Sequence, residues 1–373
     1  MNRSVAAALA LVIGFLAAAP GAAQRKKKKE KEEITQTLEV LPDPPAAVTS
    51  DVERLQFHAA PLSGQGLLSR QTRDALRALQ RLTGGGAVVR LRAFVAGTGD
   101  MRRVQAIVSE EYSERRQPLP AVSVVQVGQL PLEGAQVLIE SISAARKPVN
   151  PDGLAFISGQ AASSQNPLDP VEPLLEKSIN DLKTAVSALG AAPTDVMRVS
   201  CFLSSLDRYA DLHVKVRSAF PTAALTLLQV QRAPLTAIAE CEAVARLKTR
   251  PKAALEMLNP DGLAKSPNYS QIALLAPGRV VLSGTQMAFR YQDSDVRLAF
   301  ERLKKVLEGS KTSMRSVAMS NIYPLTGGIA ERVRAIRFEY YNKSRPPAST
   351  MLPFEGLPSL DASFAVDVIS VIE

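Results

Sequence analysis

The 373-residue chain contains two cysteines, two histidines and no tryptophan, and aromatic residues make up 5% of it. Zinc clusters, haem and iron–sulfur centres, and disulfide-stapled small proteins need more cysteine or histidine than this. Single-stranded nucleic acids are bound by stacking on aromatic side chains, which are scarce here. We therefore expect no metal, no cofactor and no nucleic-acid partner. Any chemistry must come from carboxylates, hydroxyls, amides or arginine.

The net charge of +9 is unevenly distributed along the chain. Residues 1–33 hold seven Lys and Arg against three Glu, so the other 340 residues carry only +5. A mildly basic folded part does not indicate the charged footprint of a nucleic-acid-binding domain.

The first 23 residues have the pattern of a secretory signal peptide. Arg3 supplies a positive charge, Val5–Ala19 form an apolar run, and small residues lead up to Ala23. We expect cleavage near Ala23, a charged spacer over 24–33, and a secreted or periplasmic protein with no membrane span after cleavage. Positive charge after an apolar run tends to stay in the cytoplasm, so the run Arg25–Lys29 keeps an uncleaved anchor as the alternative.

From residue 34 onward, one order of elements occurs three times: a strand, an amphipathic helix, a second strand, a second helix and two closing strands. The segments 154–160 (LAFISGQ) and 280–286 (VVLSGTQ) are strands that run into a glycine turn, and 55–60 (LQFHAA) stands in their place in the first copy. Apolar residues at helical spacing follow each of these strands.

The breaks between copies fall at 147–153 and 248–267, which are rich in Pro, Asn and Gly. We therefore predict three domains, at 34–146, 147–250 and 256–373. The second copy has little room for a first strand of its own, and we expect that strand to be short or merged with the linker.

At these residues the chain resembles the YjgF/RidA family, also described as endoribonuclease L-PSP-like. The segments that carry the resemblance are Arg70–Leu76, Phe156–Gln160, Ala239–Ala243, Asn268–Gln271, Leu282–Gly284 and Pro347–Thr350. The resemblance implies an α+β fold of three tandem chorismate-mutase-like domains, each a mixed β-sheet with two helices on one face. Because members of the family form homotrimers, it also implies a single-chain pseudo-trimer, which we expect to be a monomer.

Active members of that family hydrolyse enamines and imines derived from amino acids. An arginine binds the substrate carboxylate, and a glutamate on the last strand helps to position the attacking water. The resemblance places the arginine at Val122, Leu225 and Ser349, none of which is arginine. It places the catalytic glutamate at Glu240, whereas the other two copies have apolar residues there.

Glu240 and Glu242 lie two residues apart on a predicted strand, so both side chains should point to one face. Such a pair raises the pKa of one carboxyl toward general acid–base use. The alternative is that Glu242, like Glu140 and Asp367, pairs with basic residues between domains.

The resemblance implies a set of further ligand-binding positions, to which Glu242 is added: Ser158, Gly159, Tyr269, Ser283, Gly284 and Ser349. His213 stands on a predicted helix where the family often carries a cleft-facing asparagine. Cys201 and Cys241 lie on different strands of the second copy, and the sequence leaves open whether they form a bridge or stay as buried thiols.

We predict a secreted RidA-like protein that binds a small ligand of the amino-acid-derived class in an inter-domain cleft without efficient 2-imino acid deamination. One alternative is an enamine or imine deaminase that uses Glu240. The other is a structural or partner-binding module whose clefts are filled by side chains such as Val122 and Leu225. The sequence offers three arginines that could replace the missing one: Arg208, Arg337 and Arg345.

Overall fold

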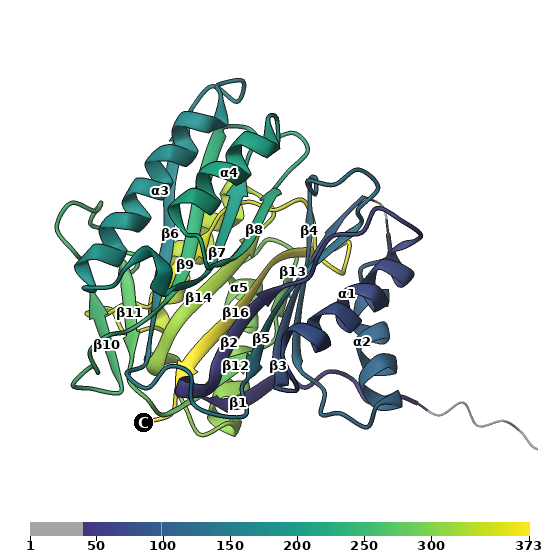
Figure 1. Cartoon of the computed structure of the whole chain (residues 1–373), viewed down its shortest axis with the longest axis horizontal. Coiled ribbons are helices and arrows are strands. Elements are labelled where there is room, and N and C mark those ends of the chain that lie inside the picture. Colours follow the sequence, from purple (N-terminus) through teal and green to yellow (C-terminus); the bar gives the residue numbers. More distant parts are fainter. Residues whose placement is uncertain (1–39, 98) are drawn as a thin grey trace, which may run out of the picture. The chain divides into compact units, whose positions relative to one another are not determined.

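The computed structural model describes residues 40–97 and 99–373 (Figure 1). The predicted signal peptide, the charged spacer and the first residues of the predicted first domain lie outside the described residues. Residues 41–373 form one compact unit. Within the described ranges, no helix has the length and apolar character needed to cross a membrane.

The described part of the chain contains three mixed β-sheets, each packed against its own pair of helices. Figure 1 shows the helix pairs α1/α2 and α3/α4 beside the first and second sheets. The first sheet is formed, in spatial order, by β2 (Leu55–Ala59), β5 (Val137–Ala144), β3 (Ala87–Ala96) and β4 (Ala121–Val127). Its helices are α1 (Leu68–Leu82) and α2 (Arg102–Glu114). Both helices bury their apolar stripes on the same face of the sheet.

The second sheet has the same core with two added edge strands. Its order is β10 (Leu255–Leu258), β11 (Ile272–Leu275), β6 (Leu154–Ser164), β9 (Ala237–Arg246), β7 (Val196–Leu203) and β8 (Ala224–Gln229). Helices α3 (Val171–Ala188) and α4 (Tyr209–Ala219) cover it, and a short 3-10 helix, η2 (Pro193–Asp195), leads into β7.

The third sheet follows the same plan. Its order is β1 (Ala47–Asp51), β12 (Arg279–Ser283), β16 (Ala362–Val371), β14 (Val317–Pro324) and β15 (Ala348–Met351), with β13 (Gln286–Phe289) also paired to β16. Its helices are α5 (Asp293–Gly309) and α6 (Gly327–Ile336). The remaining helices are 3-10 helices of three residues each: η1 (Val52–Arg54), η3 (Met314–Ser316) and η4 (Arg337–Glu339).

All three sheets share one internal register. In each, a parallel pair is joined by a crossover helix, and the last strand of the segment runs antiparallel beside it. A β-bulge falls at the same point of each pairing, between Val88 and Arg90, Val196 and Arg198, and Val317 and Met319. This register sets Glu140 opposite Arg92, Glu242 opposite Ser200 and Asp367 opposite Asn321.

The edge strands are exchanged between sheets. Strand β1 directly precedes β2 in sequence but pairs with β12 of the third sheet, and β11 precedes β12 but pairs with β6 of the second. Residues 145–150 stand where a first strand of the second segment was expected. They have no strand assignment, and the Val149 amide donates to the Glu53 carbonyl beside the first sheet (2.7 Å). Each sheet therefore takes edge contacts from a different segment of the chain.

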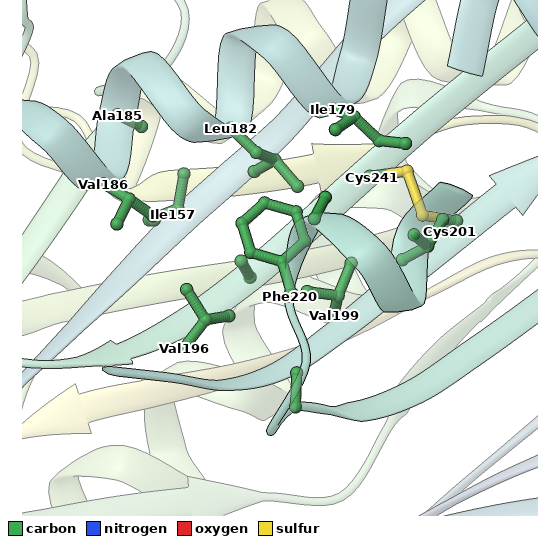
Figure 2. Packing of buried hydrophobic residues seen from close by; sticks show 14 of the residues in the cluster. Ile157, Ile179, Leu182, Ala185, Val186, Val196, Val199, Cys201, Phe220 and Cys241 are labelled. Carbon is green, nitrogen blue, oxygen red and sulfur yellow. A yellow bond between two sulfur atoms is a disulfide. The ribbon is translucent and has the colours of Figure 1, made fainter. Parts of the chain in front are cut away.

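Apolar packing fixes each helix pair on its sheet and also joins the sheets. Figure 2 shows the cluster of the second sheet, where Leu182 and Phe220 pack over Val199. Cys201 of β7 and Cys241 of β9 lie directly opposite each other and form a disulfide, which answers the question of their pairing that the sequence left open. Elsewhere the ring of Phe202 packs edge-on against Phe94 of the first sheet (5.9 Å between centroids) and against Phe354, just after β15 (5.6 Å).

Candidate functional site

Five predicted site residues come together where the second sheet meets the third: Ser158, Gly159, Glu240, Tyr269 and Ser349. The Ser349 amide donates to Ser158 Oγ (2.8 Å), which itself donates to the Ser270 carbonyl (2.6 Å). The glycine turn predicted at the end of 154–160 is instead a bulge of β6 against β9, and the strand continues through Ser158 and Gly159 to Ser164. A Cβ atom on residue 159 would lie 1.9 Å from Glu240 Oε1, so the absence of a side chain there makes room for the carboxyl group.

Glu240 is buried, with 5% of its surface exposed. Burial raises its pKa to about 7, and the nearby charge of Glu242 adds to the increase. The Met351 amide hydrogen-bonds to the carboxylate and Arg334 lies near it, and both oppose the shift. A carboxyl group with this pKa is present in both protonation states near neutral pH, as a general acid–base group must be.

Tyr269 stands at the edge of this site, half-buried, at the end of the long segment between β10 and β11. Burial raises the pKa of its hydroxyl, and the neighbouring Glu240 carboxylate raises it further. At neutral pH Tyr269 is therefore a neutral hydrogen-bond donor beside Glu240.

Arg337 is a site residue that the sequence offered only as one of three candidates. It is the first residue of η4 and is 2% exposed. Its Nη1 donates to Ser349 Oγ (3.5 Å) and its Nη2 donates to the Asn268 carbonyl, while its Nε has no hydrogen-bond partner within residues 40–97 and 99–373. Among the described residues no carboxylate forms an ion pair with it, and burial lowers its pKa to about 10. The guanidinium thus reaches Ser349, one of the three positions at which the sequence resemblance led us to look for an arginine.

The other two candidate arginines are used elsewhere. Arg208 pairs with Glu172 (3.0 Å) and Asp211 (2.8 Å) on the helical layer of the second sheet. Arg345 pairs with the Glu373 side chain at 3.8 Å.

Glu242, predicted as a ligand-binding residue, lies in a different environment. Its carboxylate accepts from Arg92 Nη2 (2.7 Å) and Arg198 Nη2 (3.2 Å). These groups belong to a buried set of six charged residues that we call the central ion cluster: Arg90, Arg92, Glu140, Arg198, Glu242 and Asp367. The alternative considered from the sequence, ion pairing of these carboxylates with basic residues, is what the contacts show.

The junction between the third and first sheets contains Ser283 and Gly284. The side chains around them differ from those at the junction of the second and third sheets. Ser283 Oγ accepts from the Val368 amide (2.9 Å) within its own sheet. A Cβ on residue 284 would lie 2.7 Å from the Val122 carbonyl oxygen, and the buried Val122 occupies the position that Ser349 has in the other junction. Ala365 replaces the glutamate there and is fully buried.

His213 lies on α4, in the helical layer, with its ring 5.7 Å from that of Tyr209. Burial lowers its pKa, and the charge of Arg217 lowers it further. In the described ranges no hydrogen bond connects it to the residues around Glu240.

Two glutamines that support the site were missed as functional candidates. Gln160 Nε2 donates to the Ser158 carbonyl (3.0 Å) and to Gln271 Oε1 (2.8 Å), which holds the bulge of β6 against the segment before β11. Both glutamines end motifs quoted for the family resemblance, so the signal was present in the sequence. In the described part of the chain, no group of three His, Cys, Asp or Glu side chains is arranged to hold a metal ion.

Comparison with known families picks out the middle of the chain. Residues 146–247 match the endoribonuclease L-PSP family. The matched range contains β6, α3, β7, α4, β8 and β9, and with them Ser158, Gly159 and Glu240. No curated protein matches the chain.

Solved structures similar to this chain each cover about a third of it. A protein of the conserved Rid family from Yersinia pestis has 14% identity and a TM-score of 0.28, over 32% of this chain and 99% of its own. A putative endoribonuclease L-PSP from Entamoeba histolytica has 20% identity and a TM-score of 0.23, over 31% and 98%. A member of the YjgF/YER057c/UK114 family from Mycobacterium tuberculosis has 16% identity and a TM-score of 0.24, over 31% and 98%.

Proposed function

We propose that the chain is a pseudo-trimer of three tandem RidA-like domains that carries one small-molecule site, at the junction of the second and third sheets. The shared strand order and the equivalent bulges support a threefold repeat. The family match of residues 146–247 supports its RidA-like character. The signal-peptide pattern supports a protein that acts outside the cytoplasm, where a disulfide such as Cys201–Cys241 persists.

The ligand we propose is a small organic acid, as expected for a compound derived from an amino acid. The observation that carries this proposal is the buried guanidinium of Arg337, which has unused donors and no carboxylate partner among the described residues. A planar guanidinium binds a carboxylate with two parallel hydrogen bonds. The protonated Glu240 and the Tyr269 hydroxyl supply neutral donors for the other end of the ligand.

Hydrolysis of a 2-imino acid is the second candidate function, favoured by the pKa of about 7 at Glu240. The Glu240 carboxylate would take a proton from a water that adds to the C=N carbon. The protonated carboxyl would return that proton to the nitrogen, which gives a carbinolamine. Transfer of the hydroxyl proton through Glu240 to the amine would then break the C–N bond, so that one water is consumed and a 2-keto acid and ammonia are released. We propose that turnover is weak, because Arg337 comes from η4 rather than from the closing strand and so holds the carboxylate in a different place.

Binding is tested with the mature chain from Gln24 onward by calorimetry, using 2-oxobutanoate and its uncharged amide as probes. Arg337→Met should weaken binding of the acid by roughly 10- to 100-fold, the worth of hydrogen bonds to a charged group, with little change for the amide. Arg332→Met is the matched control, because Arg332 is exposed and pairs with Asp293. Equal binding of the acid by wild type and Arg337→Met would refute the proposal.

Turnover is tested by letting an amino-acid oxidase generate the 2-imino acid and measuring keto-acid release. We expect a rate close to that of buffer for the wild type. A clear rate that Glu240→Gln abolishes would establish the deaminase instead.

A further inference from the structure

The central ion cluster lies where the three sheets meet, and equivalent positions of each sheet face it. Glu140, Glu242 and Asp367 occupy one register position of the three sheets. A second register position, directly after the bulge of each sheet, is occupied by Arg90, Arg198 and Met319. These three side chains line a small central cavity of about 10 Å³. That volume has room for about one water molecule, so nothing larger balances the charges.

The ion pairs of the cluster cross from sheet to sheet. Arg92 of the first sheet binds Glu140 of its own sheet and Glu242 of the second (2.7 Å). Arg90 of the first sheet pairs with Asp367 of the third, which also accepts from Ser123 Oγ of the first sheet (2.7 Å). The side chains of the six charged residues are at most 7% exposed, so water screens none of these pairs effectively.

The three sheets bring different charges to this point. In their ordinary ionised forms, the first sheet contributes two arginines and one glutamate, a net charge of +1. The second contributes Arg198 and Glu242 and is neutral. The third contributes Asp367 alone, with Met319 and Asn321 at the positions equivalent to Arg90 and Arg92, and has a net charge of −1. The buried cluster is neutral with one of each sheet, and replacing the first sheet by a third or the third by a first leaves a net charge.

We propose that the central face of each sheet is a matching surface for the other two sheets of this chain, and that it rejects a second copy of the first or third sheet. Three first sheets would bury a net charge of +3, and three third sheets a net charge of −3. Uncompensated buried charge is strongly destabilising, and like charges brought together exclude wrong partners. The cluster therefore fixes which sheets assemble, while the apolar contacts above and below it supply most of the attraction.

Relocating one charge in the full mature chain tests this proposal. Arg90→Met leaves the cluster at −1 and Met319→Arg raises it to +1, whereas the double variant Arg90→Met/Met319→Arg moves the arginine to the equivalent position of another sheet. The double variant keeps both the total charge and the side-chain volume of the cluster. Arg102→Met, which breaks an exposed pair with Asp100, is the control for loss of an arginine.

Thermal unfolding followed by circular dichroism gives the readout. We expect Arg90→Met and Met319→Arg to lower the Tm by several degrees or to prevent folding, the control to leave it unchanged, and the double variant to recover at least half of the loss. A double variant as unstable as the worse single variant, or single variants with wild-type Tm, would overturn the proposal. If both single variants fail to fold, recovery of a folded double variant still supports it, and its failure to fold counts against it.

Discussion

Two junctions of this chain use the same backbone positions for different purposes. At the junction of the second and third sheets, the Ser-Gly pair in the bulge of β6 faces Glu240, Ser349 and the buried Arg337. At the junction of the third and first sheets, the equivalent Ser-Gly pair at the end of β12 faces Val122, with Ala365 in place of the glutamate. The fold therefore keeps the Ser-Gly pair in both places, and the side chains around it decide whether the junction is a polar site or apolar filling.

The largest expected difference between the junctions is in the pH dependence of stability. The pKa of Glu240 is about 7 in the folded protein, above the ordinary glutamate value of 4.5, because the buried site disfavours the charged form. When the pKa of a carboxyl group is higher in the folded protein than in the unfolded chain, the group adds to the free energy of unfolding at pH values below its pKa in the unfolded chain. This added stability is lost as the pH rises toward the pKa in the folded protein. Linkage gives a loss of about 3 kcal/mol between pH 4.5 and 7.

Glu240→Gln removes that titration and should flatten the pH profile. Urea unfolding gives the free energy of unfolding of wild type and variant at intervals from pH 4.5 to 8. The difference between the two at each pH isolates Glu240, because the titration of all other groups cancels. The matched change Ala365→Gln at the other junction should leave the slope unchanged. Parallel profiles for wild type and Glu240→Gln would show that Glu240 does not titrate in this range.

Replacing Gly159 or Gly284 by alanine should affect different properties: ligand binding at residue 159 and stability at residue 284. Gly159→Ala forces the flexible Glu240 side chain to move, so we expect loss of binding of the organic acid with a modest change in Tm. Gly284→Ala meets the Val122 carbonyl oxygen, which the backbone fixes, so we expect a loss of about 1–3 kcal/mol with binding intact. Calorimetry and urea unfolding on both variants measure the pair, and the opposite assignment of effects would contradict the comparison.

Shortening the side chain to alanine at the equivalent residues Val122 and Ser349 should lower the free energy of unfolding by smaller and unequal amounts. Val122→Ala removes buried apolar volume and should cost about 1–2 kcal/mol without affecting ligand binding. Ser349→Ala removes only a long hydrogen bond to Arg337 and should cost less than about 0.5 kcal/mol. A larger stability loss at residue 349 than at residue 122, measured by urea unfolding, would mean that the polar junction is the more tightly packed one.

The smallest effect is expected at His213. It lies on α4 beside Tyr209, so His213→Gln should leave binding of 2-oxobutanoate within about twofold of wild type. The same calorimetric titration checks this. A tenfold loss would place the helical layer in the binding site.

The repeated strand and helix order was readable from the chain, because alternating and three-and-four spacings are local patterns. The exchange of edge strands was not, since β1 and β11 have the same apolar pattern whichever sheet they join. The motifs around Ser158, Glu240 and Tyr269 named residues that lie together. Arg337 could not be singled out, because Arg208 and Arg345 look equally suitable in sequence. They differ from it in being exposed and in having carboxylates within reach, and both differences arise from the tertiary structure.

The sequence by itself determined the order of strands and helices, the Ser-Gly pairs and the absence of arginine at residues 122, 225 and 349. These properties depend on residue type and on neighbours a few positions away. The tertiary structure alone decided that Glu242 joins an ion cluster, while Glu240, two residues before it on the same strand, has a raised pKa and forms no ion pair with the residues that the structure describes. Side chains with the same local chemistry take different roles because charges and burial depend on which sheet packs opposite them.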